Sequence, residues 1–267
     1  MALLLSSAWK NKENMAGSTG QNTRSAYGSA ETAEADIGED MTDVKLYLGD
    51  CLEVMRGMPD KSVDAVITDP PYFLPAQHYQ TRKQFQRNFS DLGILEHFFK
   101  DLYTEMARVI KDDGCFYMFC DGQSYPLFWY HGFKISKSVR PLIWDKSVSI
   151  NGYGWRHQHE LILFGEMPKA KPIPTGDGDI LKYRAVAVDS REHPAEKPVE
   201  LLIRLVEKSG ATILDPFMGS GATGISCIKA GRNFIGIEID PTYFAIAEKR
   251  IAEAQKQARI RESEVQL

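Results

Sequence analysis

The sequence predicts a single α/β domain built on a doubly wound, mostly parallel sheet, and three observations support this prediction. The chain has 267 residues, a length that one large domain can fill. The run Val63–Thr68 (VDAVIT) is short, continuous and rich in β-branched residues, as are strands that are covered on both faces. From Thr212 onward, candidate strands and helices alternate, which is typical of a doubly wound sheet.

The first half of the domain contains one strongly periodic helix among several short strands. Apolar residues recur every three to four positions from Ile94 to Ile110, so this stretch is predicted to be an amphipathic helix. A shorter helix is expected from Cys51 to Met58, where Pro59 ends it. The strands expected around these helices are Val44–Leu48, Val63–Thr68, Gly114–Cys120, Phe133–Trp144 and Glu160–Phe164.

The second half of the domain begins after a segment with little periodicity. Residues 165–191 are rich in proline, glycine and lysine, which is typical of an insertion or a recognition segment. Regular structure is then predicted as a helix over Pro198–Lys208, a strand over Thr212–Leu214, a helix over Gly221–Ala230, a strand over Phe234–Ile239 and a helix from about Pro241.

Composition argues against a membrane protein, a disulfide framework and a metal site. No apolar stretch approaches the roughly 18 residues of a membrane span, and Leu3–Leu5 is too short for the core of a signal peptide. The four cysteines form no Cys-x-x-Cys pair, and His157, His159 and Glu160 lack the spacing of a helical zinc site. We therefore expect an unsecreted, cytoplasmic protein with reduced cysteines, no metal and no membrane contact.

The net charge of −4 does not by itself indicate a partner. Residues 1–43 contain three basic and seven acidic residues, which accounts for the whole of that charge and leaves the remainder neutral. Positive charge is local instead, because residues 73–90 contain Arg82, Lys83 and Arg87 and no acid. Such a patch suits a phosphate backbone, although ordinary solvated loops have a similar composition.

The motif Asp69-Pro70-Pro71-Tyr72 follows a predicted buried strand, so it should lie at the carboxyl edge of the sheet, where open α/β folds build their sites. Two prolines stiffen the turn and preset the Asp69 carboxylate and the Pro70 carbonyl. Both could accept hydrogen bonds from an aromatic amine and favour the tetrahedral nitrogen that forms when it attacks a methyl sulfonium. Tyr72 could stack against an extruded base. Taken alone, the tetrapeptide could equally be a rigid turn.

A second motif, Ile213–Gly221, joins a predicted strand to a helix through a glycine-rich turn that lets a ligand approach the backbone closely. Glu238 ends the next strand about 20 residues on, where nucleotide-binding folds place a carboxylate against ribose hydroxyls. A dinucleotide is one ligand that would suit such a turn. Asp215, however, adds negative charge just before the glycines, which favours a cationic ligand without phosphate, such as S-adenosylmethionine.

With these two motifs in this order, the sequence resembles the amino-group DNA methyltransferases of the permuted β class, which methylate N6 of adenine or N4 of cytosine. In that class the Asp-Pro-Pro-Tyr half precedes the Phe-x-Gly-x-Gly cofactor half. The resemblance covers about Lys45–Ile251 and extends to Gly49-Asp50, to His159–Phe164 and to His193–Pro198. It implies the Rossmann-like fold of S-adenosylmethionine-dependent methyltransferases.

The resemblance also implies a set of cofactor-binding residues. Phe217, Gly219 and Gly221 would shape the methionine pocket, Glu238 would bind the ribose, and Asp50 would reach the adenine amine of the cofactor. Asp50 could instead be a helix N-cap, and Glu238 an ordinary charge at a strand end. The full set is Asp50, Cys51, Asp69, Lys197, Asp215, Pro216, Phe217, Gly219, Ser220, Gly221, Glu238 and Ile239.

By the same resemblance, the chain is expected to methylate N6 of an adenine flipped out of double-stranded DNA, because an initial Asp leans toward adenine in this class. Methylation of N4 of cytosine is the alternative. Protein or RNA N-methyltransferases are weaker alternatives, since they generally have Asn first and the cofactor motif ahead of it. A non-catalytic DNA-binding protein need not keep Asp69 or the glycines. Carbon-5 methylation needs a cysteine nucleophile, commonly after proline, and no cysteine here follows one.

The motifs also give an expected division of the chain. Residues 1–42 are predicted to be a disordered tail, 43–258 a permuted methyltransferase domain and 259–267 a frayed end, with Met1 and Met41 both possible starts. Within the domain we expect a catalytic half at 43–165, a target-recognition segment at 166–191 and a cofactor half at 192–258.

Basic and aromatic side chains in two segments are the candidates for DNA contact. The first segment follows the Asp-Pro-Pro-Tyr turn directly and the second is the predicted recognition segment. The candidates are Tyr79, Arg82, Lys83, Arg87, Lys169, Lys171, Lys182 and Arg184. Expected partners are double-stranded DNA, a second copy of the chain and a cognate restriction endonuclease, in the cytoplasm of a prokaryote or of a phage-infected cell.

Overall fold

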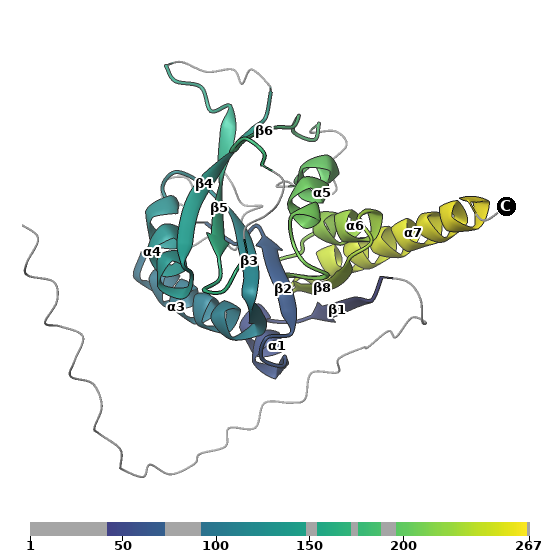
Figure 1. Ribbon diagram of the computed structural model, residues 1–267, viewed down its shortest axis with the longest axis horizontal. Coiled ribbons are helices and arrows are strands. Elements are labelled where there is room, and N and C mark those ends of the chain that lie inside the picture. Colours follow the sequence, from purple (N-terminus) through teal and green to yellow (C-terminus); the bar gives the residue numbers. More distant parts are fainter. Residues whose placement is uncertain (1–41, 73–91, 148–153, 172–175, 188–195, 266–267) are drawn as a thin grey trace, which may run out of the picture. The chain divides into compact units, whose positions relative to one another are not determined.

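The structure is a computed structural model that describes residues 42–72, 92–147, 154–171, 176–187 and 196–265. These residues form an eight-stranded sheet with helices on both faces (Figure 1). The predicted doubly wound α/β fold is therefore confirmed. In chain order the elements are β1 (Val44–Leu48), α1 (Cys51–Gly57), β2 (Val63–Thr68), α3 (Leu92–Val109), β3 (Ile110–Cys120), α4 (Tyr125–Ile135), β4 (Ser138–Asp145), β5 (His159–Glu166), β6 (Ile180–Lys182), α5 (Val199–Glu207), β7 (Thr212–Asp215), α6 (Ala222–Lys229), β8 (Asn233–Glu238) and α7 (Pro241–Val265).

The strands lie in the order β1-β8-β7-β2-β3-β5-β4-β6. The neighbours from β1 to β3 all pair in parallel, as does β6 with β4. Strand β5 pairs antiparallel with both β3 and β4. The sheet is thus mostly parallel, and the start of β5 lies at the edge where the neighbouring strands end.

Two hydrophobic cores cover the two faces of this sheet. In β3, Tyr117 and Phe119 pack with residues of α5, α6 and α7, whereas Phe116 and Met118 pack with residues of α1, α3 and α4. Successive side chains of a strand point to opposite faces, so these helix groups must lie on opposite sides of the sheet, as Figure 1 shows. Burial on both faces explains why β2 contains an almost continuous apolar run.

The connections reverse direction between β2 and β7. The chain leaves β2 through α3 to reach β3 on one side, and it leaves β7 through α6 to reach β8 on the other. Strands β2 and β7 are themselves paired, with Ala65 opposite Ile213 and Val66 opposite Leu214. A crevice for ligands opens at such a point, outside the carboxyl ends of the strands. The loops that follow β2 and β7 are the two predicted motifs.

One predicted strand is wrong. The expected strand Phe133–Trp144 is instead the end of helix α4 followed by strand β4. The helix buries Phe128, His131 and Gly132 at helical spacing, and Pro126 occupies its first turn, which is a helix-start signal that the aromatic run obscured. Two smaller differences concern the later segments: β6 lies within the predicted recognition segment, and residues 259–265 are helical rather than frayed.

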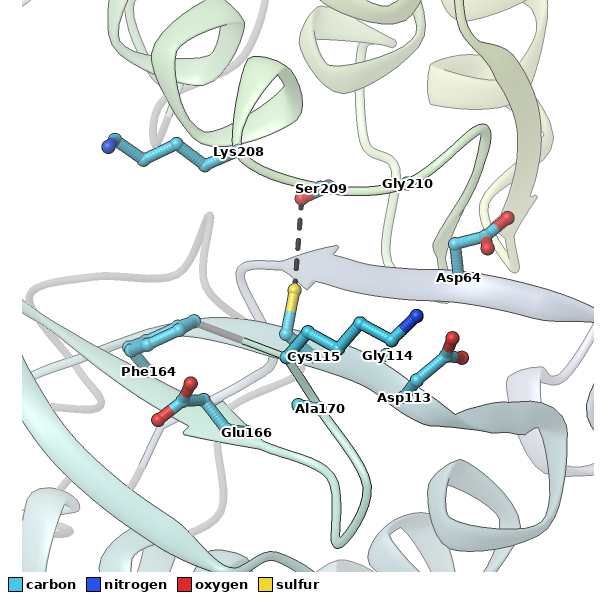
Figure 2. A pocket seen from close by; sticks show the side chains of 11 residues that line it. Asp64, Asp113, Gly114, Cys115, Phe164, Glu166, Ala170, Lys208, Ser209 and Gly210 are labelled. Carbon is cyan, nitrogen blue, oxygen red and sulfur yellow. Dashed lines mark hydrogen bonds between the residues drawn. The ribbon is translucent and has the colours of Figure 1, made fainter. Parts of the chain in front are cut away.

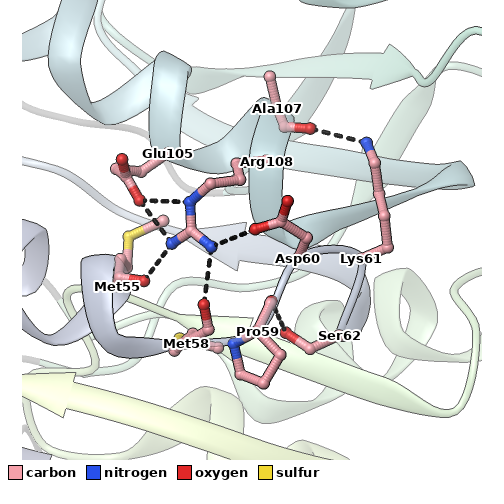
Figure 3. Close-up of polar contacts among 9 residues, drawn as sticks. All are labelled: Met55, Met58, Pro59, Asp60, Lys61, Ser62, Glu105, Ala107 and Arg108. Carbon is pink, nitrogen blue, oxygen red and sulfur yellow. Dashed lines mark hydrogen bonds and ion pairs between the residues drawn. The ribbon is translucent and has the colours of Figure 1, made fainter.

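Arg108, near the end of α3, connects this helix to the carboxyl end of α1 through hydrogen bonds (Figure 3). Its guanidinium donates to the main-chain oxygens of Met55 and Met58 at 2.5 and 2.7 Å, and to the carboxylates of Asp60 and Glu105. Met55 O also accepts from the main-chain N–H of Met58, the C-cap of α1, so the planar fork adds a second donor to Met55 O and supplies one to Met58 O just beyond the helix. The hydrogen bonds to the two carboxylates also raise the pKa of Arg108 above its ordinary value.

Replacing Arg108 with Lys should lower the free energy of unfolding by about 1 to 2 kcal/mol, because an ammonium group cannot span the same acceptors. Urea denaturation monitored by circular dichroism measures this loss. Arg140→Lys is the control, because that side chain is 58% exposed and should change stability little. Equal stabilities for the Arg108→Lys variant and the wild type would contradict the assigned role.

Candidate active site

A hydrogen bond joins the two predicted motifs at the carboxyl edge of the sheet. The hydroxyl of Thr68, the residue before Asp69, donates to Asp215 Oδ1 at 2.7 Å. Asp215 also accepts from the hydroxyl of Thr223 at 2.6 Å and from the main-chain N–H of Phe217 at 3.1 Å. Asp215 is 3% exposed. Burial raises its pKa to about 6, even though these donors favour the carboxylate.

Tyr72 and Phe217 belong to the same aromatic cluster. The ring of Tyr72 lies 6.5 Å from that of Phe128, which contacts Phe99 at 4.3 Å between centroids. The ring centroid of Phe98 lies 5.5 Å from that of Phe99 and 6.1 Å from that of Phe217, so a continuous series of ring contacts leads from Tyr72 to Phe217. The Asp-Pro-Pro-Tyr turn and the glycine-rich turn are therefore adjacent on one side of the sheet, as the sequence predicted.

Asp69 is engaged at both carboxylate oxygens. The hydroxyl of Tyr72 donates to Oδ1, and the ammonium of Lys197 lies 2.5 Å from Oδ2. Burial, together with the nearby charge of Asp69, raises the pKa of Tyr72 well above its ordinary value, so the phenol remains a donor at neutral pH. Lys197 is 7% exposed. The structure shows that Lys197 contacts the catalytic turn. Its predicted contact with the cofactor stays a prediction.

Glu238 organises the glycine-rich turn. Its carboxylate accepts from the main-chain N–H of Gly219 at 3.0 Å and from that of Asp240 at 2.8 Å. Gly221 has a left-handed φ of 85°, and a Cβ there would lie 3.1 Å from Ala247 and Ile251. Each carboxylate oxygen has further lone pairs, so Glu238 can hold the turn and still accept from a ligand hydroxyl.

Asp50 is the N-cap of α1, one of its two predicted roles. Its other predicted role, contact with the adenine amine of the cofactor, stays a prediction. Asp50 Oδ1 accepts from the main-chain N–H groups of Leu52 and Glu53 at 2.9 and 3.1 Å. The adjacent Gly49 donates to the main-chain oxygen of Glu238 at 2.9 Å, so Asp50 nevertheless lies beside the ribose candidate. Cys51 is buried, and burial raises its pKa to about 12, which leaves it a neutral thiol.

Sequence reasoning missed several side chains that hold the site together. Arg250, on α7, donates to the main-chain oxygen and the hydroxyl of Ser220 at 2.9 Å and pairs with Glu196 at 2.5 Å. It thus connects the glycine-rich turn to the segment that precedes Lys197. No local pattern marks Arg250, because its partners come from distant parts of the chain. Thr68 precedes the Asp-Pro-Pro-Tyr motif and Glu160 lies within the segment His159–Phe164. These two residues could therefore have been found from the sequence more easily than Arg250.

The predicted DNA-contact residues that the structure describes lie at two different edges of the sheet. Tyr79, Arg82, Lys83 and Arg87 lie outside the described residues. Lys182 ends β6, where it is paired with Asp145 at the carboxyl edge, and Arg184 follows closely. Lys169 and Lys171 come after the end of β5, at the opposite edge of the sheet. Lys169 and Lys171 therefore lie away from the catalytic turn, and their predicted contact with DNA stays a prediction.

A pocket of about 190 Å³ lies at this opposite edge, and its lining includes Lys171. Figure 2 shows three of its other lining residues, Asp64, Cys115 and Ser209. Burial raises the pKa of Cys115 to about 12, and its sulfur lies 3.9 Å from the Ser209 hydroxyl. The thiol is therefore not a nucleophile, and neither predicted motif borders the pocket. Among the described residues, no cluster of His, Cys, Asp and Glu is suited to a metal ion, and no helix could cross a membrane.

The pKa of Asp215 predicts how stability varies with pH in the absence of a ligand. The carboxyl group titrates near 3.8 in the unfolded chain and at about 6 in the folded one, so the folded chain binds more protons between these values. The contribution of Asp215 to the unfolding free energy should therefore fall by about 3 kcal/mol as the pH rises through this range. The difference between the wild type and Asp215→Asn in urea denaturation at several pH values isolates this contribution. A difference that is independent of pH would contradict it.

A family model described as DNA methylase (N6_N4_Mtase) matches residues 63–249, from β2 into α7. YubD of Escherichia coli (strain K12), described as a methylase, is 32% identical over 219 residues, which cover 78% of this chain and 90% of that protein. The DNA adenine methyltransferase YhdJ of the same strain is 26% identical over 250 residues, which cover 76% of this chain and 81% of that protein.

Solved structures share the fold. M1.HpyAVI, determined in complex with S-adenosylmethionine, superposes with a TM-score of 0.59 at 23% identity and covers 78% of this chain and 98% of its own. The cytosine-N4-specific PvuII DNA methyltransferase gives a TM-score of 0.62 at 16% identity, covering 82% and 93%. The fold is thus the Rossmann-like fold of S-adenosylmethionine-dependent methyltransferases. Since the family model spans most of the chain and both motifs, the chain belongs to the N6/N4 family of DNA methylases, which take their methyl group from S-adenosylmethionine.

Proposed function

We propose that this chain methylates N6 of adenine in double-stranded DNA. The observation that carries the proposal is the placement of the Asp69 carboxylate beside the glycine-rich turn, with Thr68 and Asp215 joining the two loops by one hydrogen bond. A base amine held at Asp69 would therefore meet a methyl group delivered from the adjacent turn. Methylation of N4 of cytosine is the second candidate, because it requires the same acceptors.

The amine needs help because its lone pair is delocalised into the ring of the base. Asp69 and the main-chain oxygen of Pro70 would each accept an N–H hydrogen bond, which favours a tetrahedral nitrogen with its lone pair free for attack. Such acceptors act most strongly where water is excluded, and Pro70 is buried while Tyr72 is partly so. The ring of Tyr72 would stack on the flipped base.

The residues of the glycine-rich turn fit S-adenosylmethionine. Gly221 has a left-handed φ and packs directly against Ala247 and Ile251 of α7, so a glycine is needed there for the turn to keep its shape. Glu238 supplies a carboxylate for ribose hydroxyls, and the buried Asp215 supplies negative charge near the turn without occupying it. The cofactor provides an electrophilic methyl group on a sulfonium. The remaining predicted contacts would line this pocket: Asp50, Cys51, Lys197, Pro216, Phe217, Gly219, Ser220 and Ile239.

The choice of adenine rests on the first residue of the tetrapeptide. An initial Asp leans toward adenine by the resemblance to the permuted β class, and the relative YhdJ is an adenine methyltransferase. The PvuII enzyme of similar fold is cytosine-specific, so the fold does not favour either base. The assignment to the permuted class is supported by chain order, because β2 and its motif precede β7 by well over a hundred residues although the two strands are neighbours.

Contact with DNA is proposed for the carboxyl edge of the sheet. Lys182 and Arg184 lie at that edge, and Tyr79, Arg82, Lys83 and Arg87 follow the catalytic turn in sequence. Only the short segment 166–191 separates the two predicted halves, so we propose that a second copy of the chain helps to enclose the duplex. A cognate endonuclease and a prokaryotic or phage setting remain part of this proposal.

The test is methylation of duplex DNA with S-adenosylmethionine labelled in the methyl group, followed by digestion to nucleosides and chromatography. The label is expected in N6-methyl-2′-deoxyadenosine. Asp69→Ala should lower kcat by at least about 100-fold, as the loss of a preorganised group at the reacting atoms usually does. Asp113→Ala, an exposed carboxylate at the opposite edge, is the control and should be fully active.

Label found in N4-methyl-2′-deoxycytidine would identify cytosine, and not adenine, as the methylated base and would leave the methylase assignment intact. An Asp69→Ala variant as active as the wild type would contradict the role of the catalytic turn. The mass of the chain in solution, alone and with duplex DNA, tests the proposed second copy, and one chain per duplex would overturn that part.

A further inference from the structure

A row of alternating charges leads away from Asp69 along the carboxyl edge of the sheet. Lys197 Nζ lies 2.5 Å from Asp69 Oδ2 and 3.3 Å from Glu160 Oε2. Lys146 Nζ in turn lies 2.5 Å from Glu160 Oε1. These residues come from the end of β2, the segment before α5, the start of β5 and the residue after β4. The fold therefore builds the row from four separate parts of the chain.

Lys197 is shared between two carboxylates in a site that water hardly reaches. Its side chain is 8% exposed, and those of Asp69 and Glu160 are 19% and 25% exposed. Burial alone would lower the pKa of Lys197, but Asp69 and Glu160 outweigh it, so the pKa is raised and the ammonium stays charged. The same balance holds for Glu160, because burial would raise its pKa while Lys197 and Lys146 keep it low.

The contact between Lys197 and Glu160 is the looser of the two. At 3.3 Å it is longer than a charge-assisted hydrogen bond, and among the described residues no donor reaches the buried Glu160 Oε2 with good hydrogen-bond geometry. A buried carboxylate oxygen without a well-formed hydrogen bond is stabilised when a donor approaches it. A small movement of the ammonium toward Glu160 would therefore lengthen its contact with Asp69 and shorten the other.

We propose that Glu160 is a positioning residue for methyl transfer, which acts by drawing the ammonium of Lys197 away from Asp69 when the carboxylate turns to the amino group of the base. This inference rests on the proposed function. Tyr72 and Lys197 occupy both oxygens of Asp69 in the free chain, so the base amine has to compete with them. Glu160 gives the displaced ammonium a second carboxylate, so the buried lysine stays paired while the base amine takes its place at Asp69.

A purely structural role is the competing explanation, since the same ion pairs connect β4, β5 and the start of α5. The two explanations differ in what the loss of the Glu160 charge changes. If Glu160 only held these elements together, stability and cofactor binding would fall with activity. If it positions Lys197, the turnover step is affected while the affinity for S-adenosylmethionine is retained.

The experiment compares Glu160→Gln, Glu160→Asp and Glu166→Gln in the full-length chain. Glu166 is the matched control, because it ends the same strand at the opposite edge and also pairs with basic side chains. For each variant, kcat and KM are measured with duplex DNA, the Kd of S-adenosylmethionine by calorimetry, and the melting temperature by circular dichroism. The wild type must methylate DNA first, so a failure of the proposed function is seen separately.

Glu160→Gln is expected to lower kcat roughly tenfold, less than the 100-fold or more that follows the loss of a group in direct contact with the transition state. The Kd of S-adenosylmethionine should change less than about twofold, which corresponds to a small fraction of the free energy of binding. Glu160→Asp keeps the charge and should recover part of the rate, and Glu166→Gln should match the wild type.

Three outcomes would overturn the inference. An active wild type with an unchanged kcat in Glu160→Gln would show that Lys197 needs no second carboxylate. A loss of cofactor affinity or melting temperature in proportion to the loss of rate would assign Glu160 to the scaffold. An Asp variant as slow as the Gln variant would show that side-chain shape, and not charge, is what matters at this position.

Discussion

The pairing of β2 with β7 is the constraint on which the site depends. These strands are distant in sequence, yet their ends must be adjacent for the catalytic and cofactor turns to meet. Thr68 and Asp215 fix the adjacency at atomic scale, and Thr223 and Phe217 complete the set of donors to the buried carboxylate. The helices leave the two strands in opposite directions, so a ligand can enter between the loops without displacing either helix layer.

Charge compensation is the second principle of this site. A buried ammonium is costly unless carboxylates surround it, and Lys197 has two within 3.3 Å. The arrangement keeps the pKa of Glu160 below its ordinary value, so this carboxylate stays charged in a site with little water. It also means that a change at one member of the row alters its neighbours, so single substitutions here are not expected to be additive.

Much of the fold was predictable because its signals are local. The apolar run of β2, the periodicity of α3 and the glycines before α6 each specify an element without reference to the rest of the chain. The region around Phe133 was not predicted correctly, because an aromatic run fits a strand and a buried helix equally well. Asp50 was ambiguous for a similar reason, since an N-cap and a ligand-binding carboxylate require the same residue.

The sequence by itself determined which chemical groups are present: an acidic, proline-stiffened turn and a glycine-rich turn, each following a strand. Backbone geometry makes such turns recognisable, because proline and glycine restrict or extend φ wherever they occur. Only the tertiary structure decided which groups face one another. Lys197 contacts Asp69 and Glu160, Arg250 contacts Ser220, and Lys169 contacts Asp112 at the edge opposite the catalytic turn. Such contacts depend on strand order and direction, which no local pattern encodes.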